Sequence, residues 1–505
     1  MQSKFIKHTL LFASATLISR IFGYIRDAVI AFVFGASYLT DAFFVAWRLP
    51  NTLRQLVAEG SFSAVFIPIY TSLERNNPQK AKEYISSLFS FYVLILSFIT
   101  LVVILFSKLI VVILAPGFLK EKDLLETASN LVKIVFPYLV LVGIVSFFTA
   151  VVNTKNRFFI PAVSPALLNL SFIFFALTLS EQLGIYSIAL GALFGGLLQV
   201  ILTFFLFKKE GYNLSISFKL LDEIKLTLKR ITPAFLSFGV SQFGFVIDTI
   251  LASLIMAGAI SYLYYANRIF QLPIGIFAVG LGNSLLVSLS KYYTEQKERL
   301  FDDEVNKGLK MAIILSLPAT FGMIVLGSEI IDILFNRGAF TQKDAIYTYY
   351  ALVGYALGLT FYTLTRPLKS AFFAVEDVKV PLYSTVAGIL GGVFFAVVFV
   401  FIFNMGVIGL SLASSIAGLI SFLYLYAFYF GNIYKRQILI TFVKAFFSSF
   451  IMAIIIVSLK LLIKNEYVLI GLSISVGAVS YFLLLLALRE DIVKEILSYI
   501  KRKKI

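Results

Sequence analysis

The sequence contains no cysteine and only one histidine, and these shortages exclude several classes of catalyst. Without cysteine the chain forms no disulfide and offers no thiolate for catalysis or zinc binding. The lone His8 leaves no HExxH zinc motif and no histidine-dependent catalytic triad. The phosphate-binding pattern GxxxxGK[ST] is absent as well, so we do not expect ATP hydrolysis. We therefore expect neither an enzyme nor a resident cofactor or firmly bound metal.

Charged residues are also scarce, because the chain is apolar along nearly its whole length. They make up 14% of the 505 residues, while 60% are hydrophobic. A soluble domain is closer to one quarter charged and one half apolar. Apolar runs of roughly 20 residues, the length needed to cross a bilayer core, recur throughout the chain. The sequence thus predicts an all-α polytopic membrane protein without a separate soluble domain.

We predict 14 transmembrane helices, which puts both chain termini on the same side of the membrane. Most of the 43 Lys and Arg residues fall in segments that are cytoplasmic if the N-terminus is inside. The net charge of +16 is therefore assigned to membrane topology, and no nucleic acid partner is expected. The predicted spans are 9–34, 41–70, 84–107, 129–152, 161–181, 184–207, 231–256, 260–289, 308–327, 345–368, 380–403, 406–430, 438–460 and 466–487.

An internal repeat with an offset of about 220 residues divides the predicted spans into two sets. DAFFVAWRLP at 41–50 aligns with SYLYYANRIF at 261–270, which matches Arg48 with Arg268. Each repeat holds six spans, so we predict two pseudo-symmetric six-helix lobes with a binding site between them. The predicted divisions are an N-terminal lobe (1–210), a cytoplasmic amphipathic linker (211–230), a C-terminal lobe (231–432), and the last two spans with a basic cytoplasmic tail (433–505).

Several charged residues lie inside predicted spans, where hydrocarbon should exclude them. One Arg or Asp at the bilayer centre costs roughly 2.5–3.5 kcal/mol on insertion scales, so these side chains must face a wet cavity or one another. The first two spans hold four Arg residues and three acidic residues, and the eighth span holds a fifth Arg. The residues are Arg20, Arg26, Asp27, Asp41, Arg48, Arg54, Glu59 and Arg268.

Two interpretations of these charges remain open. In the first, Arg20–Asp27 and Arg48–Asp41 are internal ion pairs and Arg26 extends toward the membrane surface. In the second, the surplus of planar, bidentate donors binds a polyanionic ligand, such as a phosphate or several carboxylates. We favour the second, because ion pairs cannot account for every Arg.

Two acidic features could have other roles. Asp248 lies within the seventh predicted span and could be a cation ligand or a hydrogen-bonded residue of a cavity wall. The run Asp302–Glu304 could hold Mg²⁺ in a membrane-embedded phosphotransferase or glycosyltransferase. We instead predict that this run lies on a solvated amphipathic helix and can be replaced without loss of function.

Over essentially the whole chain, the sequence resembles the MurJ (MviN) family of lipid II flippases, part of the multidrug/oligosaccharidyl-lipid/polysaccharide exporter superfamily. The resemblance rests on SRIFGYIRD (19–27), TDAFFVAWRLPNTLRQLVAEGSFSAVFIP (40–68) and YYANRIFQLPIGIFAVGLG (264–282). It implies alternating access that carries lipid II, the undecaprenyl-pyrophosphate-linked peptidoglycan precursor, from the cytoplasmic to the periplasmic leaflet of the bacterial inner membrane. The alternative is a flippase for another lipid-diphosphate-linked glycan, such as an O-antigen or teichoic-acid precursor.

The resemblance also implies roles for individual residues and partners. Substrate-binding roles carry over to Arg20, Arg26, Arg54 and Arg268, and roles in the cavity or in gating carry over to Asp41 and Glu59. Na⁺ or H⁺ would be the coupling ion, with Asp248 as a plausible ligand and Asp377 as a weaker one. Membrane lipids and the peptidoglycan synthesis machinery are the further expected partners. From their position alone we add Arg48 to the substrate-binding set and Asp27 to the acidic set.

Overall fold

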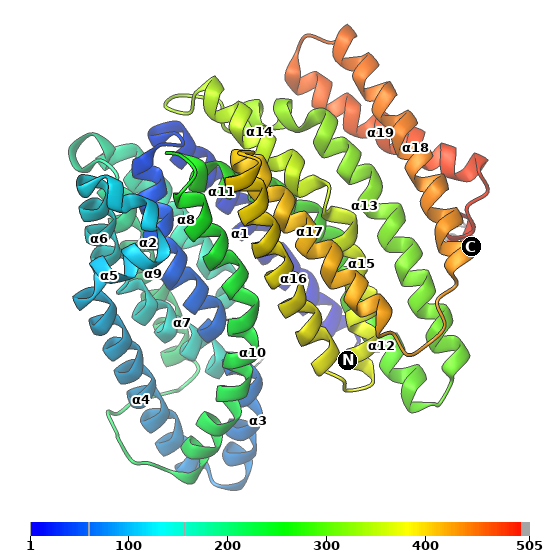
Figure 1. Cartoon of the computed structure of the whole chain (residues 1–505). Coiled ribbons are helices and arrows are strands. Elements are labelled where there is room, and N and C mark those ends of the chain that lie inside the picture. Colours follow the sequence, from blue (N-terminus) through cyan, green and yellow to red (C-terminus); the bar gives the residue numbers. More distant parts are fainter. Residues whose placement is uncertain (1, 59–60, 156, 496–505) are drawn as a thin grey trace. The chain divides into compact units, whose positions relative to one another are not determined.

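The computed structural model describes residues 2–58, 61–155 and 157–495, and every regular element in these ranges is a helix (Figure 1). Each apolar run predicted to span the membrane falls on one helix or on consecutive helices. The chain divides into two compact units, of which unit 1 comprises residues up to Ser261 together with Arg337–Phe340. Unit 2 comprises Tyr262–Asn336 and Thr341–Ile505.

Unit 1 is built mainly from the helices that precede residue 254. A buried aromatic cluster that includes Phe66, Tyr84, Phe147 and Phe207 forms the core near α3, α4, α7 and α9. The elements are α1 (Gln2–Phe34), α2 (Tyr38–Ala58), α3 (Ser61–Asn76), α4 (Pro78–Leu105), α5 (Ser107–Leu114), η1 (Pro116–Lys120), α6 (Lys122–Val135), α7 (Tyr138–Asn153), α8 (Phe159–Leu183), α9 (Tyr186–Lys209) and α10 (Asp222–Ser253).

Unit 2 is organised around the long helix α13. The hydroxyl of Tyr481 on α19 donates to the carbonyl oxygen of Ile314 at 2.7 Å, which fixes α19 against α13. The elements are α11 (Ala259–Pro273), η2 (Ile274–Ala278), α12 (Val279–Thr294), α13 (Glu298–Leu334), α14 (Gln342–Ala356), α15 (Leu359–Ala374), α16 (Lys379–Val397), η3 (Val398–Ile402), α17 (Gly406–Ala427), α18 (Lys435–Leu462) and α19 (Glu466–Ala487).

Ten helical segments among the described residues are long and apolar enough to cross a membrane. Helix α2 is not one of them, since Asp41, Arg48 and Arg54 interrupt it. The chain is thus a multi-pass helical membrane protein. The ten segments are Pro78–Leu105, Lys122–Asn153, Phe159–Leu183, Tyr186–Lys209, Ala259–Thr294, Glu298–Leu334, Lys379–Ile402, Gly406–Ala427, Lys435–Leu462 and Glu466–Ala487.

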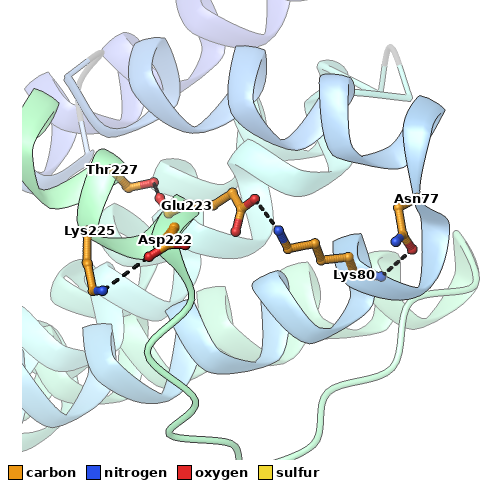
Figure 2. Close-up of polar contacts among 6 residues, drawn as sticks. All are labelled: Asn77, Lys80, Asp222, Glu223, Lys225 and Thr227. Carbon is orange, nitrogen blue, oxygen red and sulfur yellow. Dashed lines mark hydrogen bonds and ion pairs between the residues drawn. The ribbon is translucent and has the colours of Figure 1, made fainter.

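The start of α10 packs onto the start of α4 through polar contacts (Figure 2). Glu223 forms an ion pair with Lys80, which holds the pKa of Glu223 below its usual range. The hydroxyl oxygens of Thr227 and Tyr84 are 2.7 Å apart. These contacts place α10 in unit 1, whose continuous part ends at Ser261. The predicted linker 211–230 stays a prediction. The predicted functional lobes 1–210 and 231–432 and the segment 433–505 stay predictions.

The acidic run at 302–304 is not wholly solvated, so our prediction was wrong at Asp302. Its side chain is buried and accepts hydrogen bonds from Tyr429 Oη (3.1 Å) and from Asn432 N and Nδ2 (both 3.0 Å). Asn306 Nδ2 donates to the Asn432 carbonyl oxygen at 2.8 Å. Asp302 therefore fastens the α17–α18 connection to α13. Its carboxylate oxygens are occupied by hydrogen bonds from neutral protein donors, which is not the arrangement of a Mg²⁺ ligand.

Replacement of Asp302 by alanine is expected to destabilise unit 2 by about 1–3 kcal/mol, because three hydrogen bonds to its buried carboxylate are lost. Limited proteolysis of the 428–434 connection and thermal unfolding in detergent would measure the loss. Glu304→Ala is the matched control, since Glu304 lies in the same run and is not among the buried residues. Equal stability of the two variants would contradict the assigned role of Asp302.

Candidate functional site

A buried polar network surrounds Arg26 in the C-terminal third of α1. Its Nε and Nη2 donate to Asp27 Oδ1 at 2.9 and 2.7 Å, and its Nη1 donates to Asn169 Oδ1 on α8 at 3.1 Å. The guanidinium also lies over the Phe172 ring, 5.5 Å from its centroid. Asp27 is 1% exposed and Arg26 is 7% exposed. The ion-pair interpretation required Arg26 to extend toward the membrane surface. The structure instead buries its guanidinium group between α1 and α8.

Asn169 completes this network, and the sequence analysis missed it. Its Nδ2 donates to the Ser19 carbonyl oxygen of α1 at 3.1 Å, so one amide joins α8 to two points of α1. A Cβ at Gly23 would lie 3.6 Å from the same Nδ2, so α1 approaches α8 closely at this glycine. The available signal was a single Asn at the end of the otherwise apolar segment FIPAVSPALLN (159–169).

Arg20 lies in a different environment from Arg26. Its side chain is exposed, and it forms no ion pair among the residues that the structure describes. The alternative pairing of Arg20 with Asp27 is therefore wrong. Arg20 retains its donors for a ligand, whereas the donors of Arg26 are engaged by Asp27 and Asn169.

Helix α2 contributes two half-buried guanidinium groups. Arg48 lies over the Phe245 ring of α10, 5.9 Å from its centroid, and Arg54 Nε donates to Asn51 Oδ1 at 3.1 Å. Each of these contacts helps to orient its guanidinium group. Glu59, the third predicted acidic residue, lies outside the described residues.

Asp41 is buried at the start of α2 and binds the start of α11. It accepts hydrogen bonds from Gly258 N (2.7 Å), Ser261 N (2.8 Å) and Ser261 Oγ (2.6 Å), and it is 2% exposed. A carboxylate at a helix N-terminus satisfies free amide groups and opposes the positive end of the helix dipole. Asp41 therefore fastens the segment Gly258–Ser261, which belongs to unit 1 and includes the first turn of α11, to α2. It does not pair with Arg48, the partner that the ion-pair interpretation assigned to it.

The remaining predicted residues lie in separate local settings. In unit 2, Arg268 is half-buried, with its guanidinium 5.5 Å from the centroid of the Tyr264 ring. Asp248 is half-buried in α10 of unit 1. In unit 2, Asp377 accepts from the backbone nitrogens of Lys379 (2.9 Å) and Val380 (3.3 Å), so it caps the first turn of α16. The described residues contain no cluster of three metal-ligating side chains.

The fold and these intramembrane cations define a helical transporter. A multidrug resistance transporter of the MOP superfamily, in an inward-facing conformation, covers 86% of this chain and 98% of its own with a TM-score of 0.66. At 13% identity that likeness shows the fold alone. A solved structure of lipid II flippase MurJ in an inward-closed conformation covers 96% of this chain and 100% of its own, with a TM-score of 0.82 and 29% identity.

Sequence comparisons identify the family. The model of the family described as lipid II flippase MurJ matches residues 30–489. The probable lipid II flippase MurJ of Aquifex aeolicus is 35% identical over 491 residues, which cover 96% of this chain and 95% of the relative. That of Buchnera aphidicola subsp. Schizaphis graminum is 37% identical over 416 residues, 81% of this chain and 80% of the relative. The chain belongs to the lipid II flippase MurJ family.

Proposed function

We propose that this chain is a lipid II flippase, which carries the undecaprenyl-pyrophosphate-linked peptidoglycan precursor from the cytoplasmic to the periplasmic leaflet of the bacterial inner membrane. The match of the family over residues 30–489 is the observation that supports this most strongly. The role is transport without a chemical reaction, and it serves cell-wall biogenesis and cell shape. The proposed topology has 14 spans, two six-helix lobes plus α18 and α19, and both termini in the cytoplasm.

In the proposed alternating-access cycle, the diphosphate and the peptide carboxylates of lipid II meet guanidinium groups. Arg20 is the first candidate, because it is exposed within α1 and forms no ion pair among the described residues. Arg48, Arg54 and Arg268 are half-buried and oriented by aromatic rings or an amide. Planar guanidinium groups suit this ligand, because each can donate two parallel hydrogen bonds to a phosphate or carboxylate.

Arg26 would take part only after exchanging its present partners. Its guanidinium donates to both Asp27 and Asn169, so a substrate anion must compete with a buried carboxylate for it. We propose Asp27 as the internal counterion that keeps Arg26 ordered until substrate arrives. For the coupling ion, Na⁺ or H⁺, Asp248 remains the proposed ligand. Asp377 is a weaker choice, since its carboxylate already caps α16.

Alanine at Arg20 or at Arg268 is expected to abolish rescue of cells depleted of their own lipid II flippase. Each change removes a charged donor from the substrate, and membrane levels of the protein are expected to stay normal. Growth and cell shape measure rescue, and immunoblots of membranes measure the protein. Arg157→Ala is the control, because Arg157 forms an exposed pair with Glu210 at 2.9 Å, of little energetic weight. Normal rescue by both test variants would show that neither Arg20 nor Arg268 is needed to bind the substrate.

A further inference from the structure

The coil between α9 and α10, residues 212–221, runs beside the N-terminal half of α4 (Figure 1). We call it the 212–221 strap. It follows Gly211, whose positive φ of 86° turns the chain away from α9. Three of its apolar side chains are largely exposed: Ile216 by 88%, Phe218 by 55% and Leu220 by 57%. Three exposed apolar side chains in a short coil outside the membrane-spanning segments call for an explanation.

Serine hydroxyls of α4 accept hydrogen bonds from backbone amides of the strap. Ser215 N donates to Ser86 Oγ at 3.3 Å, and Ser217 N donates to Ser90 Oγ at 3.1 Å. The hydroxyls of Ser217 and Ser87 lie 2.8 Å apart. Backbone groups need such protein partners where water is absent, because hydrocarbon offers no hydrogen bonds in exchange. The contacts are those expected of a segment that lies at the edge of a bilayer.

The contacts with α4 also define how deep the strap extends. Lys219 lies 3.4 Å from Glu83, in the charged first turns of α4. The Phe218 ring contacts the Phe91 ring, 5.6 Å between centroids, about two turns further along α4. Phe91 is one turn before Leu94, which is 53% exposed and begins the lipid-facing stripe of this membrane-spanning helix. The apex of the strap therefore lies deeper along α4 than its end.

We propose that the 212–221 strap inserts Ile216, Phe218 and Leu220 among the phospholipid acyl chains of the leaflet at the N-terminal end of α4. The occupant is lipid because the strap continues the apolar stripe of a spanning helix and because α4 supplies the missing backbone partners. The strap thereby anchors the α9–α10 connection at the interface, as amphipathic interfacial segments do. Its position depends on α4 crossing the membrane and not on which substrate the protein carries.

The natural absence of cysteine makes a direct test simple. A nitroxide label on Ile216→Cys, in the full chain reconstituted in phospholipid vesicles, reports collisions with oxygen, which concentrates in lipid, and with a nickel chelate, which stays in water. Phe98→Cys is the lipid-exposed reference on α4, and Glu298→Cys is the exposed reference at the start of α13. We expect the oxygen-to-nickel ratio at 216 to exceed that at 298 severalfold and to approach that at 98.

Two results would overturn the proposal. A ratio at 216 equal to that at 298 would place the strap in water, and low access to both reagents would mean that protein covers it. In a second variant, Ser86→Ala and Ser90→Ala should release the strap and lower the ratio at 216 toward the value at 298. An unchanged ratio would show that Ser86 and Ser90 do not hold the strap in place. No lipid II is present in these measurements, so a failed flippase assay would leave their outcome unaffected.

Discussion

Asp41→Ala is expected to abolish transport and to lower the free energy of unfolding by about 3–5 kcal/mol, because it leaves buried donors without an acceptor. Gly258 N, Ser261 N and Ser261 Oγ all donate to this carboxylate, and alanine replaces none of these bonds. The start of α11 would separate from α2. Thermal unfolding of the purified protein and rescue of flippase-depleted cells measure the two effects.

Two further variants separate the buried contact from the charge. Asp41→Asn keeps an acceptor oxygen and should lose less stability than alanine, while Ser261→Ala removes only the bond from Oγ. The order of stability is expected to be wild type, then Ser261→Ala and Asp41→Asn, then Asp41→Ala. Wild-type stability in Asp41→Ala would refute the fastening role of this residue.

Arg26→Ala is expected to cost a similar amount, about 3–5 kcal/mol, since it breaks a buried ion pair by removing the guanidinium group that binds the Asp27 carboxylate. Asp27 is 1% exposed and cannot regain water without opening α1. The amide of Asn169 would lose a donor to its Oδ1 as well. Unfolding in detergent measures the loss, and transport is expected to disappear with it.

The double variant Arg26→Ala with Asp27→Asn tests whether Arg26 does more than stabilise. Asp27→Asn should recover most of the lost stability, because a neutral amide then replaces the buried carboxylate that paired with Arg26. Transport is expected to stay absent, since the guanidinium that we assign to substrate is still missing. Recovery of both stability and transport would assign Arg26 a purely structural role.

The helices were predictable from sequence because long apolar runs have few alternatives to helix in a membrane. Intramembrane charges were equally visible, since each stands out against an apolar background. The side chains with which these charges pair could not be predicted from sequence. Spacing on α1 suggested that Arg20 pairs with Asp27, but Asp27 binds its neighbour Arg26. Adjacent residues on a helix do not normally face each other, and the contacts of Arg26 with Asn169 and Phe172 on α8 are part of its actual orientation.

Contacts between distant segments were the other part that sequence could not supply. The pattern around Asp302 is that of an amphipathic helix, and nothing local to it indicates a connection 130 residues later. The same holds for Asp41, whose acceptor role depends on amide groups 217 and 220 residues away. Each acidic residue was correctly noticed as unusual, and its role became clear only from the backbone that folds against it.

The central claim is that this chain moves lipid II across the membrane. The most direct test depletes a bacterium of its own lipid II flippase, supplies this chain, and measures the fraction of lipid II that reaches the periplasmic leaflet. We expect wild-type protein to restore that fraction and the Arg20→Ala variant to leave it at the depleted level. Failure of inserted, wild-type protein to restore periplasmic lipid II, or export of a different lipid-diphosphate-linked glycan in its place, would contradict the claim.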